Sequence, residues 1–247
     1  MTVSGTTDLN NRSGSAEDIA RALEQVASAL SHDVRGPLRH GNHFLDFFED
    51  AAGELPEEAA EHLGFVRSSL SSAASMVETL VRFSRLSLKP DRMSALNLSD
   101  LLVEAMSRSK VSLDTPDVSF SVSGTAEIRG DEAYLLSLFM HLFENAIMFC
   151  PADRPAKVGA FIRLTDDEKV EILVEDNGNG VVGTEASAFR LFMKSQTNHP
   201  QQGEGTGLAF ARRYAELHGG NVHLATEPGS LGGAAFVVTL PTSRVSS

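Results

Sequence analysis

Cysteine and tryptophan are the residues that the chain has least of: Cys150 is the one cysteine in 247 residues, and tryptophan is absent. A single cysteine excludes an internal disulfide and a metal site made of several cysteines. No apolar run reaches the about 18 residues that a membrane-spanning helix needs, and the polar first fifteen residues lack the apolar core of a signal peptide. We therefore expect a reduced, cytoplasmic protein that does not enter a membrane.

Basic residues are also few. The chain has 21 Lys and Arg against 33 Asp and Glu, a formal charge of −12. An acidic surface repels phosphate backbones and anionic lipids, so nucleic acid and membrane surfaces are not expected partners. The length and the hydrophobic content of 42% predict one large domain or two modest ones.

The first half of the chain has helical periodicity. Residues 1–14 are polar and predict disorder, while residues 15–89 carry two runs with apolar side chains every three or four positions, broken at 53–56. This pattern predicts two long antiparallel helices joined by a short turn. Because a lone hairpin cannot bury two apolar stripes, we expect a homodimer in which two hairpins form a four-helix bundle.

The pattern changes near residues 89–96, where we place a domain boundary. Residues 95–243 predict an α/β domain with a mixed sheet and its helices on one face. The expected helices are 98–109, 131–149 and 205–218, and the expected strands are 117–123, 126–129, 157–164, 169–175, 221–226 and 234–240.

His32 is a candidate nucleophile on the first predicted helix. With Leu30 and Val34 in the bundle seam, the helical repeat places His32 on the outside, next to the carboxylate of Asp33. An imidazole attacks a phosphoryl group through Nε2 when an acceptor holds the proton of Nδ1. A surface His–Asp pair is usually only solvated. Pro37 makes a functional role of the His32–Asp33 pair the better interpretation. A proline inside a helix costs about 3 kcal/mol, and the sequence keeps its helical pattern in spite of this cost.

Residues 31–39, Ser-His-Asp-Val-Arg-Gly-Pro-Leu-Arg, resemble the phospho-acceptor box of two-component sensor histidine kinases. The resemblance implies that His32 is phosphorylated and that Asp33 is its acid/base partner. The family usually has Thr or Asn four residues after the histidine, and the resemblance assigns this side chain the role of positioning water for dephosphorylation of the response regulator. Gly36 stands there in this chain, which predicts weak or absent phosphatase activity.

Three later segments have features of a nucleotide site. Asp176 ends a predicted strand and can accept a bond from an exocyclic amine, while Gly178 and Gly180 let the backbone approach a base. The segment 203–208 opens a helix whose free amides suit phosphate oxygens; its candidate residues are Gly203, Gly205, Thr206, Gly207 and Leu208. The amide oxygen of Asn145 suits a Mg²⁺ that also holds phosphates. Taken alone, each segment could equally be an ordinary turn or a helix-surface amide with no role in nucleotide binding.

In this order the segments resemble the ATP-binding (Bergerat-fold) domain of the same kinases, shared with gyrase-type ATPases and Hsp90. Residues 141–149 resemble its asparagine box, 176–180 and 203–208 its two glycine boxes, and 189–192 its phenylalanine box. The resemblance implies ATP and Mg²⁺ as cofactors, with residues 181–202 as a lid and Lys194 as the candidate contact to the γ-phosphate.

Two positions depart from the family pattern. His141 replaces the first asparagine of the box, and Met148 replaces a Lys or Arg three residues after Asn145. The missing cation predicts weaker ATP affinity or slower transfer. Because the other motifs are present, we expect the nucleotide site to be functional despite these two departures.

The sequence thus predicts a histidine kinase that autophosphorylates His32 and passes the phosphoryl group to an aspartate in a response regulator receiver domain. Two alternatives stay open: a histidine phosphotransferase or pseudokinase with a non-catalytic ATP domain, and a Bergerat-fold serine kinase of the anti-sigma type. No sensor domain precedes the hairpin in this chain, so the signal is expected from a separate sensor protein or from an upstream sensor domain.

Overall fold

The structure is a computed structural model that describes residues 7–86, 90, 92–115, 117–181, 183–193, 203–227 and 229–242. For residues 7–21 and 23 it describes the backbone only. The chain divides into two compact units, Met1–Leu88 and Lys89–Ser247. Each unit is described by itself.

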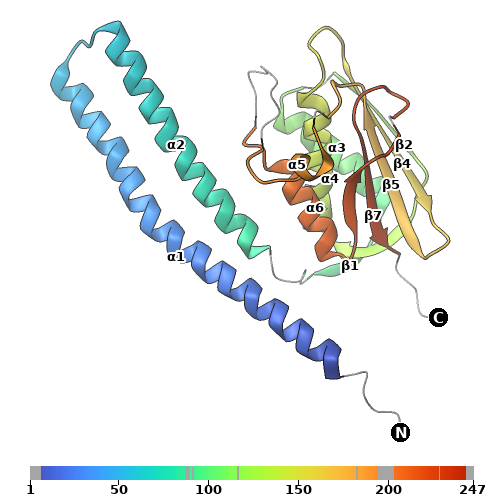
Figure 1. The fold of residues 1–247 in the computed structure, drawn as a ribbon. Helices are drawn as coiled ribbons and strands as arrows, with labels where there is room; N and C mark the ends of the chain where they lie inside the picture. The colour runs from blue at the N-terminus through green and yellow to red at the C-terminus, as the bar shows by residue number, and fades with distance from the viewer. Residues whose placement is uncertain are drawn as a thin grey trace. The chain divides into compact units, whose positions relative to one another are not determined.

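The first unit is a hairpin of two helices, α1 (Thr7–Ala52) and α2 (Glu57–Arg85) (Figure 1). Gly53, with a φ of 69°, ends α1, and Glu57 and Glu58 provide the negative charges that favour the first turn of α2. Helix α1 begins at Thr7, so the expected disorder up to residue 14 is corrected for residues 7–14. Once a helix is nucleated, each further residue adds a hydrogen bond at little cost.

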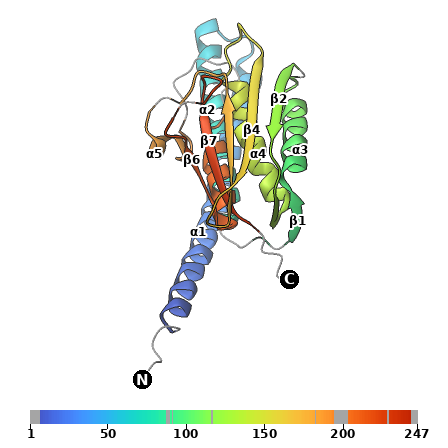
Figure 2. The ribbon, with the colours of Figure 1, turned by 90° about the vertical axis from the view of Figure 1, so that its right-hand side faces the viewer.

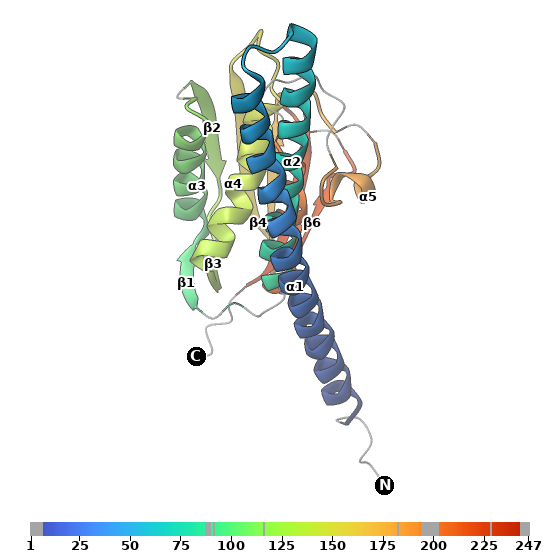
Figure 3. The same ribbon diagram turned by 90° about the vertical axis from the view of Figure 1, so that its left-hand side faces the viewer.

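The two helices run antiparallel and side by side (Figure 3). Gly41 of α1 lies close to α2: an added Cβ there would be 3.2 Å from a Leu70 methyl group. Near the turn, Arg67 of α2 binds both Asp46 and Glu49 of α1, each at 2.8 Å. A second ion pair joins Arg35 of α1 to Glu78 of α2 at 3.4 Å. The hairpin is thus held together by apolar contacts and by ion pairs from two arginines.

The second unit alternates short strands and helices. It consists of β1 (Met93–Asn97), α3 (Leu98–Ser112), β2 (Val118–Ser123), β3 (Glu127–Asp131), α4 (Glu132–Met148), β4 (Ala156–Leu164), β5 (Lys169–Asp176), α5 (Glu185–Ala188), α6 (Gly207–Leu217), β6 (Asn221–Leu224) and β7 (Ala235–Pro241). Asn97 and Asp131 cap α3 and α4 by accepting backbone N–H bonds, which explains why each helix begins where its strand ends.

The main sheet has the strand order β2-β4-β5-β7-β6. Strands β2 and β4 are parallel and the other pairs antiparallel, as the expected mixed sheet requires. Helices α3, α4 and α6 cover one face (Figure 2). Alternate residues of β5, among them Ile172 and Val174, are buried, and so are Phe139, Phe143 and Phe210 of the covering helices. The predicted α/β fold class is confirmed.

Two short elements differ from the expectation. Residues 93–97 form β1, which pairs antiparallel with β3 in a separate two-stranded sheet. Residues 185–188, inside the segment expected to be a lid, form the single-turn helix α5. Helix α5 is only one turn long, and the residues of β1 are mostly exposed, so neither element produces a readable hydrophobic period in the sequence.

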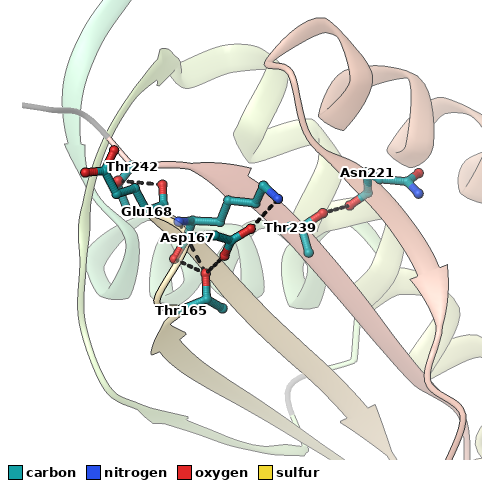
Figure 4. A network of polar contacts seen from close by, with 7 residues as sticks. Thr165, Asp167, Glu168, Asn221, Thr239 and Thr242 are labelled. Atoms are coloured by element: carbon teal, nitrogen blue, oxygen red, sulfur yellow. Dashed lines mark hydrogen bonds and ion pairs between the residues drawn. The ribbon is translucent and has the colours of Figure 1, made fainter.

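Hydrogen bonds close the end of the sheet opposite Asp176 (Figure 4). The tight turn between β4 and β5 contains Glu168, which has a φ of 57°. The carbonyl of Glu168 accepts bonds from the N–H and the hydroxyl of Thr242, at 3.0 and 2.7 Å. This network anchors the chain after β7. Within the part of the chain that the structure describes, no helix has the length and apolar character needed to span a bilayer.

Candidate nucleotide and phospho-acceptor sites

Asp176 lies at the end of β5 in a nearly closed environment, with only 6% of its surface exposed. Its Oδ1 accepts the N–H groups of Gly178 and Ala234, at 2.8 and 2.9 Å. Burial raises the pKa of this carboxyl, while the two backbone hydrogen bonds oppose the rise. The side chain is therefore fixed in position through one oxygen, and Oδ2 makes no hydrogen bond among the described residues.

The loop after Asp176 is attached to the end of α4. Asn179 N–H donates to the carbonyl of Phe149 at 3.2 Å, and an added Cβ on Gly178 would lie 2.9 Å from the same oxygen. Gly180 has a φ of 73°, which L side chains rarely adopt. Asn177 bonds to the backbone of Lys157 and Pro155. These contacts bring residues 176–180 next to the helix that carries Asn145.

Helix α4 places His141 and Asn145 one turn apart on the side that meets α6. The first residue of α6, Gly207, lies between these two side chains: its ideal Cβ position is 3.5 Å from His141 Nδ1 and 3.8 Å from Asn145 Nδ2. The His141 ring is nearly parallel to that of Tyr214, with an interplanar angle of 10° and centroids 6.3 Å apart. The structure thus brings together two motifs that are about 60 residues apart in the sequence.

The start of α6 is an open helix end. Thr206, at the N-cap position, makes no capping bond through its side chain and is buried, so the first amides of the helix have no side-chain cap. Gly205 has a φ of 73°, and nothing lies within 4 Å of the Cβ position of Gly203. Leu208 follows in the first turn, half-buried. Such a helix end attracts anionic oxygens.

These residues fit ATP and Mg²⁺ in their chemistry. The free oxygen of Asp176 suits an adenine amine, and the amides before α6 suit phosphates. The structure shows no group of three or more His, Cys, Asp or Glu residues that would form a metal site, again within its described part. A Mg²⁺ that keeps several waters and binds phosphates needs only one or two protein oxygens, and Asn145 offers one. Lys194 lies outside the described residues.

His32 and Asp33 lie on α1 in the other unit. Both side chains are almost fully solvated, 91% and 82% exposed, and His32 Nδ1 is 3.1 Å from Asp33 Oδ1. An ionised carboxylate only accepts, so this contact holds the proton on Nδ1 and leaves the lone pair of Nε2 to the solvent. Helix α1 continues through Pro37.

Sequence reasoning missed the groups that support Asp176. Gly233 donates its N–H to the backbone oxygen of Asp176 at 2.9 Å, and Ala234 bonds to both its side chain and its backbone. The only signal in the sequence is the pair Gly232-Gly233, which stands directly before the predicted strand 234–240. Nothing in the sequence indicates that the carbonyl of Phe149 accepts the N–H of Asn179, because every residue has a backbone carbonyl.

Comparison with known proteins gives a consistent result. Residues 130–244 match the family model described as histidine kinase-, DNA gyrase B-, and HSP90-like ATPase. The sensor protein KdpD of Mycobacterium tuberculosis is 31% identical over 252 residues, which cover 94% of this chain and 28% of KdpD. The phytochrome-like protein Cph1 of Synechocystis is 23% identical over 221 residues, covering 89% of this chain and 29% of Cph1. The chain spans less than a third of these relatives.

Among solved structures, full-length ShkA in complex with AMPPNP superimposes with a TM-score of 0.58 and 25% identity. The match covers 89% of this chain and 46% of ShkA. The α/β unit is therefore an ATP-binding domain of the Bergerat type. Together with the preceding helical hairpin, it identifies the chain as a two-component sensor histidine kinase core.

Proposed function

We propose that this chain autophosphorylates His32 with ATP and transfers the phosphoryl group to an aspartate in the receiver domain of a response regulator. The observation that carries the proposal is the combination of two sites in one chain. One is an exposed imidazole oriented by Asp33 at 3.1 Å. The other is a buried carboxylate at Asp176, whose loop bonds to the end of α4, the helix that also meets the uncapped start of α6 through His141 and Asn145.

In this reaction Nε2 of His32 attacks the γ-phosphorus, and the bond to the β–γ bridging oxygen breaks with ADP as the leaving group. Asp33 keeps the Nδ1 proton in place and stabilises the positive charge that develops on the ring. Asp176 recognises adenine through Oδ2. The amides of residues 203–208 bind phosphate oxygens.

Mg²⁺, held through Asn145, neutralises charge on the phosphates when it is bound. Lys194 is proposed as the residue that contacts the γ-phosphate. Its role follows from the resemblance to the family alone.

We further propose a homodimer through the hairpin. Apolar side chains on both helices are open to solvent in the single hairpin, including Val26 (64% exposed), Leu30 (53%), Phe44 (72%), Phe48 (52%) and Leu80 (39%). A second hairpin would bury them in a four-helix bundle. The relatives are longer sensor proteins, so the input signal is proposed to come from a further domain or a separate sensor.

The proposal is tested with γ-labelled ATP and Mg²⁺, comparing wild type with His32→Ala and with His43→Ala, a control on the same helix. We expect label on wild type and on His43→Ala only, acid-labile and base-stable as in a phosphoramidate. Equal labelling of His32→Ala would overturn the assignment. ATP binding without any label would favour the pseudokinase or phosphotransferase alternative, and acid-stable label would favour the serine kinase.

A further inference from the structure

Arg212 of α6 connects three parts of the ATP-binding domain. Its Nε donates to the carbonyl of Val222 in β6 at 2.8 Å, and a terminal nitrogen donates to Glu185 Oε1 in α5 at 2.6 Å. The guanidinium carbon lies 3.5 Å from the centroid of the Phe189 ring. One half-buried side chain thus makes a backbone bond, an ion pair and a cation–π contact at once.

The contacts of Arg212 fix the α5 segment, which we define as residues 183–193. Glu185 lies at its start and Phe189 near its middle, where the ring is 8% exposed and packs edge-on against Phe236 of β7 at 6.3 Å. In Figure 1, α5 lies beside α6. Without Arg212, the segment would keep the Phe189–Phe236 contact but lose its ion pair to the helix.

The α5 segment is connected to two parts of the candidate nucleotide site, the loop after Asp176 and the start of α6. It follows the loop of Asp176 and Gly180 in the chain, and α6, to which Arg212 ties it, begins at Gly207 between His141 and Asn145. A segment attached at these places can leave its position only if the Arg212 contacts break. The ion pair and the ring contact are both directional, so neither lysine nor glutamine reproduces the three contacts.

We propose that Arg212 is a positioning residue for nucleotide binding: by holding the α5 segment against α6, it slows the release of nucleotide. This inference rests on the proposed function, since it assumes that ATP binds beside Asp176 and Gly207. It adds a residue that touches neither adenine nor phosphate and acts through Glu185 and Phe189.

The test compares wild type with Arg212→Gln, Arg212→Lys and Glu185→Gln. The control is Arg213→Gln, which removes the neighbouring arginine and its surface pair with Glu216 on the same helix. Two quantities are measured. The first is amide hydrogen exchange of residues 183–193 in the nucleotide-free protein, and the second is the dissociation rate of mant-ADP by stopped flow.

We expect Arg212→Gln to raise both rates about tenfold, the effect of losing one charge-assisted contact. Arg212→Lys and Glu185→Gln should give smaller increases, and Arg213→Gln none. Adding Glu185→Gln to Arg212→Gln should change little further, because the two side chains act as a pair. A purely structural role would lower the melting temperature without changing the dissociation rate.

Unchanged exchange in Arg212→Gln would show that the contacts do not hold the segment. Raised exchange with an unchanged dissociation rate would overturn the role in nucleotide binding. Failure of the wild type to bind mant-ADP is a different result: it would overturn the proposed function itself, whereas normal wild-type binding with no effect of Arg212→Gln would overturn this inference alone.

Discussion

Gly233 lies directly against the Asp176 side chain, with no room for a methyl group between them. An added Cβ would be 2.2 Å from Oδ1 of Asp176 and 2.5 Å from both its backbone oxygen and the amide nitrogen of Gly178. The same oxygen accepts the N–H bonds of Gly178 and Ala234. The orientation of the candidate adenine acceptor therefore depends on a glycine 57 residues away in the chain.

Gly233→Ala should abolish detectable ATP binding, since the new methyl group must displace the carboxylate or break its backbone bonds. Isothermal titration with ATP measures the loss. Gly232→Ala is the control, because nothing lies within 4 Å of its Cβ position and its φ of 85° adds only local strain. Equal binding by Gly233→Ala and wild type would show that Asp176 is not the adenine acceptor.

Asp176→Asn should have opposite effects on folding stability at neutral pH and on ATP binding. Burial raises the pKa of Asp176 above its usual 3.8, so the folded state holds this proton more tightly than the unfolded state does. Proton binding by the Asp176 carboxyl therefore stabilises the folded state at low pH. This stabilisation is lost as the pH rises through the raised pKa. Asparagine keeps the oxygen that accepts the two backbone bonds but carries no charge.

We therefore expect the unfolding free energy of Asp176→Asn, relative to wild type, to increase as the pH rises from 3.8, the usual pKa of the carboxyl, through its raised pKa in the folded state. Urea titrations across this range measure it. ATP binding should be lost, because the amide presents a donor where an acceptor is needed. Asn145→Ala should instead keep adenine recognition and lose the dependence on Mg²⁺. A relative stability that falls with pH would contradict the assigned effect of burial.

The strand that carries Asp176 is predictable from the sequence, because it depends on the pattern of neighbouring residues. The alternation of Val170, Ile172 and Val174 sets β5 and its end at Asp176. The Arg212 contacts and the closeness of Gly233 were not predictable, because they join residues that only the folded sheet brings together. Strand β1 was missed because its five residues are mostly exposed and pair only with β3.

Met148→Lys tests the departure at the end of α4. No basic residue lies in the last turn of this helix, where a cation also interacts favourably with the helix dipole. If the amides of residues 203–208 bind the phosphates as proposed, and a lysine at the end of α4 reaches them, it should tighten ATP binding about tenfold. The measurement is titration at low and high salt, with Met148→Gln as the uncharged control. The same gain with glutamine would exclude a phosphate contact.

His218 joins the end of α6 to the start of α4. Its Nε2 accepts the N–H of Asp131 at 3.0 Å, and its Nδ1 is 2.7 Å from the carbonyl of Tyr214. Because the ring is buried, His218→Ala leaves the Asp131 amide without its partner and should cost roughly 2 kcal/mol of unfolding free energy. His223→Ala, on the half-buried side of β6, should cost much less. Thermal unfolding compares the two.

Gly36 gives the sharpest test of the phospho-acceptor site. It lies one turn after His32 on α1, and nothing lies within 4 Å of its Cβ position, so a larger side chain fits there. Glycine has no group to orient an attacking water, which is needed for hydrolysis of a phospho-aspartate but not for transfer from His32. We expect wild type to have little or no phosphatase activity toward its regulator, and Gly36→Thr and Gly36→Asn to gain it.

The measurement is the decay of purified phospho-regulator with ADP present, in buffer, with wild type and with each variant. Gly36→Ala is the matched control, because it adds helix stability of about 1 kcal/mol without a polar group. A gain of hydrolysis with Gly36→Ala would point to helix stiffness rather than water positioning. Rapid decay with wild type would show that this face of α1 catalyses hydrolysis without a side chain at position 36, and the argument from the missing polar group would fail.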